Sequence, residues 1–208
     1  MIHDNVLILK HDLVTIDDTA RVDSYCKIEG GLGVRIGKGV HVSSFAHLNI
    51  GGGLLVVGDY VALTSGVRVV TGSNTAAGLS MSSASPVEMQ VVERKEVVID
   101  DYAFVGAGAT ILPGVHIGRF AIVGAGSVVT KDVKASEVVM GIPARVVGHR
   151  CFDTETGEGF IAWLPKLRDL AAQRDIDRVR QRYGDAMPEA MAVDLVEAIN
   201  ALTMEVTG

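Results

Sequence analysis

The chain has 208 residues, which is enough for one domain of ordinary size with a short appendage. Its net charge of −6 gives no support to a nucleic-acid partner, and no apolar run approaches the roughly 18 residues of a membrane span. With only Cys26 and Cys151 and no signal-peptide pattern at the N-terminus, we expect a cytoplasmic protein without a disulfide framework.

Aliphatic residues recur every six positions over most of the first 133 residues, with a small residue four positions after most of them. Slips of phase at 34–36 and 49–56 predict short corner insertions there. The aliphatic positions, in chain order, are Ile16, Val22, Ile28, Ile36, Val42, Leu48, Val57, Leu63, Val69, Ile99, Val105, Ile111, Ile117, Val123 and Val129.

A period of six fits neither a helix nor an ordinary hairpin, but it fits a unit made of a short strand and a turn. Three such units close a triangular coil of 18 residues, and coils stack about 4.8 Å apart as parallel strands. The 24 glycines suit the many tight corners of such a solenoid. The sequence therefore predicts an all-β solenoid of about five coils between residues 14 and 133.

The repeat stops between residues 70 and 97, where a loop is predicted. Its stretch "SGVRVVTGSNTAAGLSMSSASP" (residues 65–86) contains no His, Cys, Asp or Glu. Arg68, Arg94 and Lys95 flank the loop, where they either meet a pyrophosphate or are ordinary solvated charges.

From residue 151 the six-residue repeat, which we call the lattice, is absent, and apolar residues recur at helical spacing. We therefore expect two domains, a solenoid over 1–150 and a helical extension over 151–208. The extension is predicted to cap the solenoid or to serve oligomerisation, with contact to another protein as the alternative.

The strings "IDDYAFVGAGATILPGVHIGRFAIVGAGSVVTKDV" and "VVMGIPARVV" resemble the hexapeptide-repeat acyltransferases, in particular the galactoside and maltose O-acetyltransferases and their nucleotide-sugar relatives. The resemblance implies a left-handed parallel β-helix, a homotrimer, and acetyl-CoA bound between neighbouring subunits. Carried over residue by residue, it places contacts to CoA at Ala107, Ala125, Thr130, Lys131 and Arg145, with the two cationic side chains suited to phosphates. In the alternative reading, "VVTKDV" only closes the last coil.

The resemblance also implies a catalytic base, a His in the loop that interrupts the repeat, but the corresponding residue here is Asn74. Asn cannot accept the proton of a sugar hydroxyl. An amino sugar needs a base less, because its nitrogen is a better nucleophile. Asn74 would then orient the acceptor or donate to the tetrahedral oxyanion.

Two histidines are candidates for a base supplied from elsewhere. His47 lies in "AHLN", which resembles a segment where the family places a sugar-contacting Asn, and His116 is expected one coil above Asn74. His47 and His116 are equally consistent with histidines that are only exposed or lie at a subunit interface. For His41 we expect only this non-catalytic role. Zinc is not expected, because His41 and His47 are six residues apart and fall on different faces.

The sequence thus favours an acetyl-CoA-dependent acetyltransferase acting on a nucleotide-linked amino sugar or a polysaccharide precursor. The alternatives are an O-acetyltransferase with His47 as base and a catalytically silent solenoid that serves as a binding or assembly module.

Overall fold

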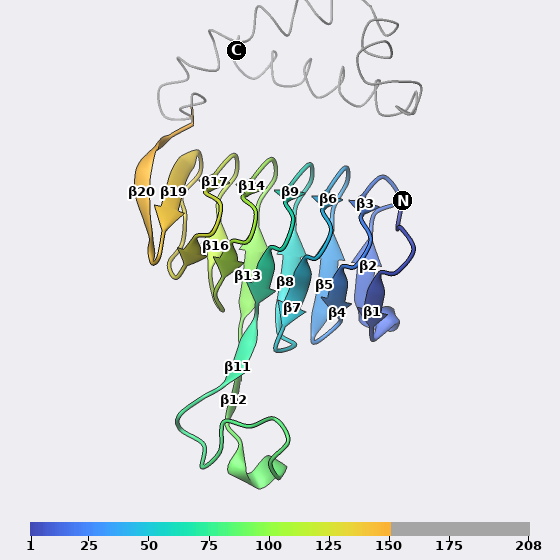
Figure 1. Cartoon of the computed structure of the whole chain (residues 1–208), viewed down its shortest axis with the longest axis vertical. Helices are drawn as coiled ribbons and strands as arrows, with labels where there is room; N and C mark the ends of the chain where they lie inside the picture. The colour runs from blue at the N-terminus through green and yellow to red at the C-terminus, as the bar shows by residue number, and fades with distance from the viewer. Residues whose placement is uncertain (151–208) are drawn as a thin grey trace, which may run out of the picture. The chain divides into compact units, whose positions relative to one another are not determined.

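The computed structural model describes residues 1–150; the predicted helical extension, residues 151–208, lies outside the described residues. The described chain winds into a left-handed parallel β-helix whose three sheets form the sides of a triangular coil. Figure 1 shows the successive coils side by side. The predicted fold class is therefore confirmed for the solenoid.

Each side of the solenoid is one sheet, and neighbouring strands within it are parallel except for β19 and β20. The six-stranded sheet contains, in order, β1 (Leu7–Leu9), β4 (Lys27–Glu29), β7 (His47–Ile50), β10 (Arg68–Val70), β15 (Thr110–Ile111) and β18 (Val128–Val129). The five-stranded sheet contains β2 (Val14–Ile16), β5 (Gly33–Ile36), β8 (Leu54–Val57), β13 (Glu96–Ile99) and β16 (His116–Ile117). The seven-stranded sheet contains β3 (Arg21–Val22), β6 (His41–Val42), β9 (Ala62–Leu63), β14 (Phe104–Val105), β17 (Ile122–Val123), β19 (Glu137–Gly141) and β20 (Ala144–His149).

The six-residue lattice is the core of the solenoid. Its aliphatic residues from Val22 onward are all buried, and the small residues four positions later share the same interior. Stacked coils place equivalent side chains above one another, as in the register of Val105 with Leu63 and Val123. The repeat therefore encodes both the turn of the coil and the burial of its side chains.

The coil count differs from the prediction of about five. The sheets hold six, five and seven strands, so the solenoid has six to seven coils. The extra length comes from both ends: β1 pairs with β4 before the first lattice residue, and β19 and β20 follow the last one. Because the six-residue spacing is not kept at either end, the sequence pattern did not predict these terminal strands.

The predicted loop leaves the solenoid between β10 and β13 and includes a short ribbon of two antiparallel strands, β11 (Gly72–Asn74) and β12 (Val92–Arg94). We call residues 71–95 the arm. It projects from the corner between the six-stranded and five-stranded sheets, and its far end carries the short 3-10 helix η2 (Val87–Met89) (Figure 1). A second 3-10 helix, η1 (His11–Leu13), lies near the N-terminus.

Among residues 1–150, no helix is long and apolar enough to cross a membrane.

Candidate functional site

One corner of the solenoid changes character along its length. We call it the glycine corner; it joins the seven-stranded sheet to the six-stranded sheet, and its turning residues all have positive φ. The N-terminal coil turns at Asn5, and in the next two coils these residues are Tyr25 and Phe45, whose rings stack 5.5 Å apart and which are 60% and 66% exposed. In the next three coils they are Gly66, Gly108 and Gly126. The corner is therefore bulky toward the N-terminus and bare toward the C-terminus.

Two predicted CoA-contacting residues, Ala107 and Ala125, lie on the bare part of the glycine corner. Both are exposed, and the Gly126 N–H donates to the Ala107 carbonyl at 2.8 Å, so the two turns stack directly. A Cβ added at Gly108 or Gly126 would meet nothing within 4 Å. The corner thus offers open backbone along which an extended amide-bearing ligand can lie.

The β19–β20 hairpin brings a third predicted CoA-contacting residue to this corner. Arg145 is exposed on β20 and pairs with Met140, which lies against Gly124, the residue before Ala125. The Gly141 N–H, at the hairpin turn, donates to the buried Ser127 hydroxyl at 3.1 Å. The guanidinium of Arg145 is therefore held by a hairpin that is anchored at the glycine corner.

The remaining two predicted CoA-contacting residues lie elsewhere. Thr130 and Lys131 follow β18, at the corner from which the arm also departs, and both are exposed. We call this the arm corner. The width of the six-stranded sheet separates it from the glycine corner, so one subunit does not gather all five residues around one point.

His47 lies on the outer face of the six-stranded sheet and forms a pair with a carboxylate. Its Nε2 is 2.7 Å from Glu29 Oε1, which also accepts from Lys27 Nζ at 2.8 Å. Burial opposes ionisation of Glu29, but the hydrogen bonds from Lys27 and His47 outweigh it and hold the pKa of this carboxyl below its ordinary value. A carboxylate at this distance fixes the orientation of the imidazole ring, and a general base must be held in a defined orientation.

His116 forms a similar pair on a different sheet. Its Nε2 is 2.8 Å from Asp100 Oδ2, and its backbone N–H donates to Asp132 Oδ1 at 2.9 Å. The expectation that it lies one coil above Asn74 is wrong: its register partner is Val98, because the chain around Asn74 has left the coil. His47 and His116 are therefore not brought together within one subunit.

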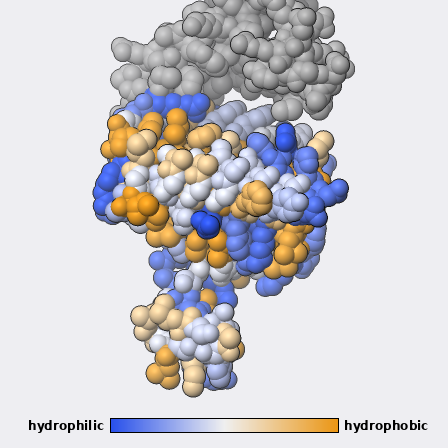
Figure 2. Space-filling model, in the orientation of Figure 1, coloured by the Kyte–Doolittle hydropathy of each residue, from blue (hydrophilic) through white to orange (hydrophobic). Residues whose placement is uncertain are grey.

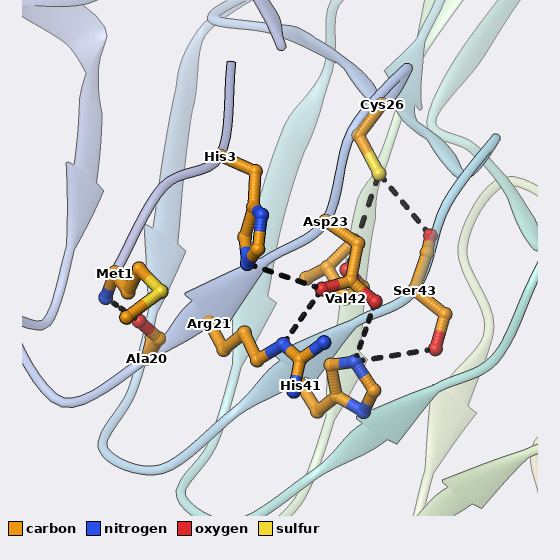
Figure 3. A network of polar contacts seen from close by, with 9 residues as sticks. All are labelled: Met1, His3, Ala20, Arg21, Asp23, Cys26, His41, Val42 and Ser43. Carbon is orange, nitrogen blue, oxygen red and sulfur yellow. Dashed lines mark hydrogen bonds and ion pairs between the residues drawn. The ribbon is translucent and has the colours of Figure 1, made fainter. Parts of the chain in front are cut away.

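A third pair, on the seven-stranded sheet, is part of the network in Figure 3. His41 Nε2 is 2.9 Å from Asp23 Oδ2 and 3.4 Å from Ser43 Oγ. Carboxylate and hydroxyl thus share one ring nitrogen, whereas a catalytic triad uses both nitrogens. Burial opposes ionisation of Asp23, but hydrogen bonds from His41 and Arg21 hold its pKa below the ordinary value. We read this network as structural.

Asn74, which replaces the histidine of the resembling family, is engaged within the arm. Its Nδ2 donates to the Met81 carbonyl at 2.9 Å and to Gln90 Oε1 at 3.2 Å. Both amide hydrogens thus hold the irregular part of the arm to β11. The oxygen Oδ1 makes no hydrogen bond within the described chain, so Asn74 is placed to accept a hydrogen bond rather than to donate one to an oxyanion.

A cavity of about 370 Å³ lies at the root of the arm. Its lining combines backbone, hydroxyl, amide, thioether and guanidinium groups, from Gly51, Ser73, Asn74, Met81, Ser83, Gln90, Val92 and Arg94. It belongs mainly to β11, β12 and the loop between them. Asn74 is thus the one predicted catalytic residue that lines it.

A buried polar chain anchors the root of the arm to the solenoid, and the sequence analysis missed it. The Thr71 hydroxyl donates to Asn49 Oδ1 at 2.6 Å, and Asn49 Nδ2 donates to the Glu29 carbonyl at 2.6 Å. Asn49 and Thr71 are fully buried. Because Glu29 also pairs with His47, the arm is anchored in the same coils that hold this histidine.

No three His, Cys, Asp or Glu side chains within residues 1–150 cluster as metal ligands. His41 and His47 lie on different sheets, as expected. The free thiol of Cys26 is buried, and burial raises its pKa, so it is not a ready thiolate.

Residues 96–131 match the family described as "Bacterial transferase hexapeptide (six repeats)". Among curated proteins, the 2,3,4,5-tetrahydropyridine-2,6-dicarboxylate N-acetyltransferase of Staphylococcus aureus is 40% identical over 103 residues. That match covers 50% of this chain, and the chain spans only 39% of the relative's length.

Two solved structures share the fold. A mutant of AntD, an N-acyltransferase from Bacillus cereus in complex with dTDP-4-amino-4,6-dideoxyglucose and coenzyme A, has a TM-score of 0.67 at 25% identity, covering 72% of this chain and 80% of AntD. The hexapeptide-repeat acetyltransferase VCA0836 from Vibrio cholerae has a TM-score of 0.54 at 27% identity, covering 63% and 70%. Residues 96–131 thus carry the hexapeptide repeat of the bacterial transferases, and the solenoid shares its fold with an N-acyltransferase and with a hexapeptide-repeat acetyltransferase.

Proposed function

We propose that the protein transfers an acetyl group from acetyl-CoA to the amine of a nucleotide-linked sugar, a precursor of a polysaccharide. The transfer takes place between neighbouring subunits of a homotrimer. The observation that carries this proposal is the bare part of the glycine corner, where Ala107 and Ala125 expose stacked backbone within the segment that matches the transferase repeat.

The positions of the five CoA candidates support a site shared by two subunits. Ala107, Ala125 and Arg145 gather at the glycine corner, whereas Thr130 and Lys131 lie at the arm corner. A long cofactor meets both sets when the glycine corner of one solenoid faces the arm corner of its neighbour. The bare corner receives the pantetheine, and the cationic side chains meet the phosphates.

The acceptor is assigned from the chemistry of Asn74 and from the relatives. AntD is described as an N-acyltransferase in complex with a dTDP-linked amino sugar, and the Staphylococcus aureus relative is an N-acetyltransferase. Asn74 cannot take a proton, but its Oδ1 is available to accept an N–H. That contact would orient the lone pair of a neutral amine.

The reaction then needs no general base before attack. The amine lone pair attacks the thioester carbonyl carbon, and the tetrahedral intermediate collapses with loss of the C–S bond. The nitrogen gives up one proton to water, and the departing thiolate takes up one proton to become CoA–SH.

Two measurements test the proposal. Calorimetric titration with acetyl-CoA should give binding, and release of free thiol should be faster with nucleotide-linked amino sugars than with their hydroxyl counterparts. Absence of binding to both CoA and acetyl-CoA would sink the enzyme assignment and leave a solenoid that only binds or assembles. Turnover of hydroxyl sugars alone would refute the amine acceptor.

The pairing of His47 with Glu29 favours a second candidate, O-acetylation with His47 as base. In that case His47→Ala should slow transfer by about 10²-fold or more, the usual contribution of general base catalysis. His116→Ala, which removes the same kind of pair from another sheet, is the matched control and should slow transfer much less. Wild-type rates in both variants would remove these histidines from the mechanism and favour the amine.

A further inference from the structure

We propose that the cavity at the root of the arm binds the diphosphate of the nucleotide-linked acceptor, with Arg94 as its anion-binding residue. This inference rests on the proposed function and names the part of the acceptor that the arm recognises. The sequence alone left Arg68, Arg94 and Lys95 as equal candidates for such a contact, and the structure separates them.

The charge of the cavity favours an anion. Its lining includes one cationic side chain, Arg94, and no carboxylate; the remaining polar groups are the hydroxyls of Ser73 and Ser83 and two side-chain amides. A uniformly signed site attracts a ligand of the opposite sign, and a guanidinium suits phosphate oxygens because it can donate two parallel hydrogen bonds.

Arg94 has no ion-pair partner among residues 1–150, although it lies between two charged residues. Glu93 and Lys95, its neighbours in sequence, form an ion pair with each other at 3.0 Å. Within residues 1–150, no ion pair or hydrogen bond engages the Arg94 side chain. Because successive side chains of a strand point to opposite faces, the ribbon directs Arg94 toward the cavity and the Glu93–Lys95 pair away from it.

Glycines beside Arg94 keep the space around it open. Gly72 lies opposite Arg94 in the ribbon, and a Cβ there would be 3.2 Å from Arg94 Cγ and 2.7 Å from the Gly51 carbonyl. A Cβ on Gly51 would be only 2.0 Å from the Gly72 carbonyl, and one on Gly52 would be 3.9 Å from Arg94 Nε. The guanidinium therefore extends over bare backbone, where phosphate oxygens can approach it.

Size and position distinguish the acceptor from CoA, which also contains a diphosphate. The volume of about 370 Å³ is within the range of small-molecule sites. The cavity is bordered by Gly51, which follows β7, whereas the predicted CoA contacts Ala107 and Ala125 lie in later coils. We therefore assign the diphosphate in this cavity to the nucleotide-linked acceptor. Titration with nucleoside diphosphates and, separately, with CoA distinguishes the two ligands.

The test compares Arg94→Gln with Lys95→Gln in the full-length protein. Calorimetric titrations use thymidine diphosphate, uridine diphosphate and CoA as separate probes. Loss of a charge-assisted bidentate contact should weaken binding of the nucleoside diphosphates by about tenfold or more in Arg94→Gln. Lys95→Gln removes the same charge one residue away and should leave their binding within about twofold. Unchanged CoA binding in both variants shows that they are folded.

Three outcomes with the variants would overturn the inference. They are unchanged nucleoside diphosphate binding in Arg94→Gln, equal weakening by both substitutions, and weakening of CoA binding alone, which would make the cavity a donor site. A wild-type protein that binds CoA but no nucleoside diphosphate would refute this inference and leave acetyl transfer standing. A wild-type protein that binds nucleoside diphosphates but no CoA would refute the proposed acetyl transfer. The role of Arg94 would then still be decided by nucleoside diphosphate binding in Arg94→Gln against Lys95→Gln.

Discussion

The solenoid and the arm belong to one chain but are stabilised in different ways. In the solenoid, almost every lattice side chain is buried, and each coil contacts the coils on both sides of it. In the arm, no residue from Ser73 to Glu96 is buried, and Leu79, Val87 and Met81 are 88%, 79% and 61% exposed. Figure 2 shows apolar residues on the outer surface of the arm.

The difference indicates that the solenoid determines the stability of residues 1–150, whereas we propose that the arm recognises the acceptor. A two-stranded ribbon alone is marginally stable in water, so the arm depends on its anchor, Asn49 and Thr71, and on hydrogen bonds such as those of Asn74. Exposed apolar side chains on such a ribbon are suited to contact with another surface. In the proposed trimer, that surface is the neighbouring subunit.

The largest expected effect is on stability and comes from truncating the solenoid core. Ile111→Ala removes a fully buried side chain and should lower the free energy of unfolding by about 2–5 kcal/mol. Leu79→Ala removes an exposed side chain from the arm and should change it by less than about 0.5 kcal/mol. Denaturant titration measures both. Similar losses would show that the arm is as much a part of the core as the coils.

A smaller effect is expected within the arm. Asn74→Ala removes two hydrogen bonds worth about 0.5–1.5 kcal/mol each, and should speed amide hydrogen exchange in residues 75–91. Exchange in the solenoid should not change. Ser83→Ala, at an exposed hydroxyl with no hydrogen bond in the described chain, is the control. Faster exchange throughout the solenoid in Asn74→Ala would mean that arm and body open together.

The smallest effect concerns acid pH. The pKa of Glu29 is lowered in the folded protein, so its ion pairs stabilise the protein above the unfolded pKa of about 4.3 and lose that contribution as the pH falls through the folded pKa. Glu29→Gln should therefore destabilise by less than about 1 kcal/mol at pH 7, and the difference from wild type should vanish at acid pH. Glu88→Gln removes an exposed carboxyl from the arm and is the control for the loss of one negative charge. A constant difference at all pH values would contradict the assignment.

The solenoid could be predicted from the sequence because one period encodes both turn and burial. The arm could not, since β11 and β12 are three residues long and show no alternation of apolar and polar residues. Asn74 was found from the family's motif, but its contacts with Met81 and Gln90 come from irregular chain that no periodicity describes.

The histidine–carboxylate pairs were missed, although a signal for them exists. The register partners of the three histidines are Arg21, Lys27 and Val98, and each carboxylate, Asp23, Glu29 or Asp100, lies two residues after that partner. A search for acidic residues two positions after the residue that lies one coil before each histidine would have proposed all three pairs. Arg94 was found only as one of several cations, because its lack of a partner depends on the pairing of its neighbours.

The reversal at the β19–β20 hairpin has a consequence for the growth of the molecule. A parallel sheet edge can be extended by any further strand of the same direction, within the chain or from another copy. Because β20 runs antiparallel to β19, the seven-stranded sheet ends in a strand that points the other way. Within residues 1–150, the parallel pairing of this sheet therefore stops at β19, and any strand that extended the sheet beyond β20 would have to pair with a strand of reversed direction.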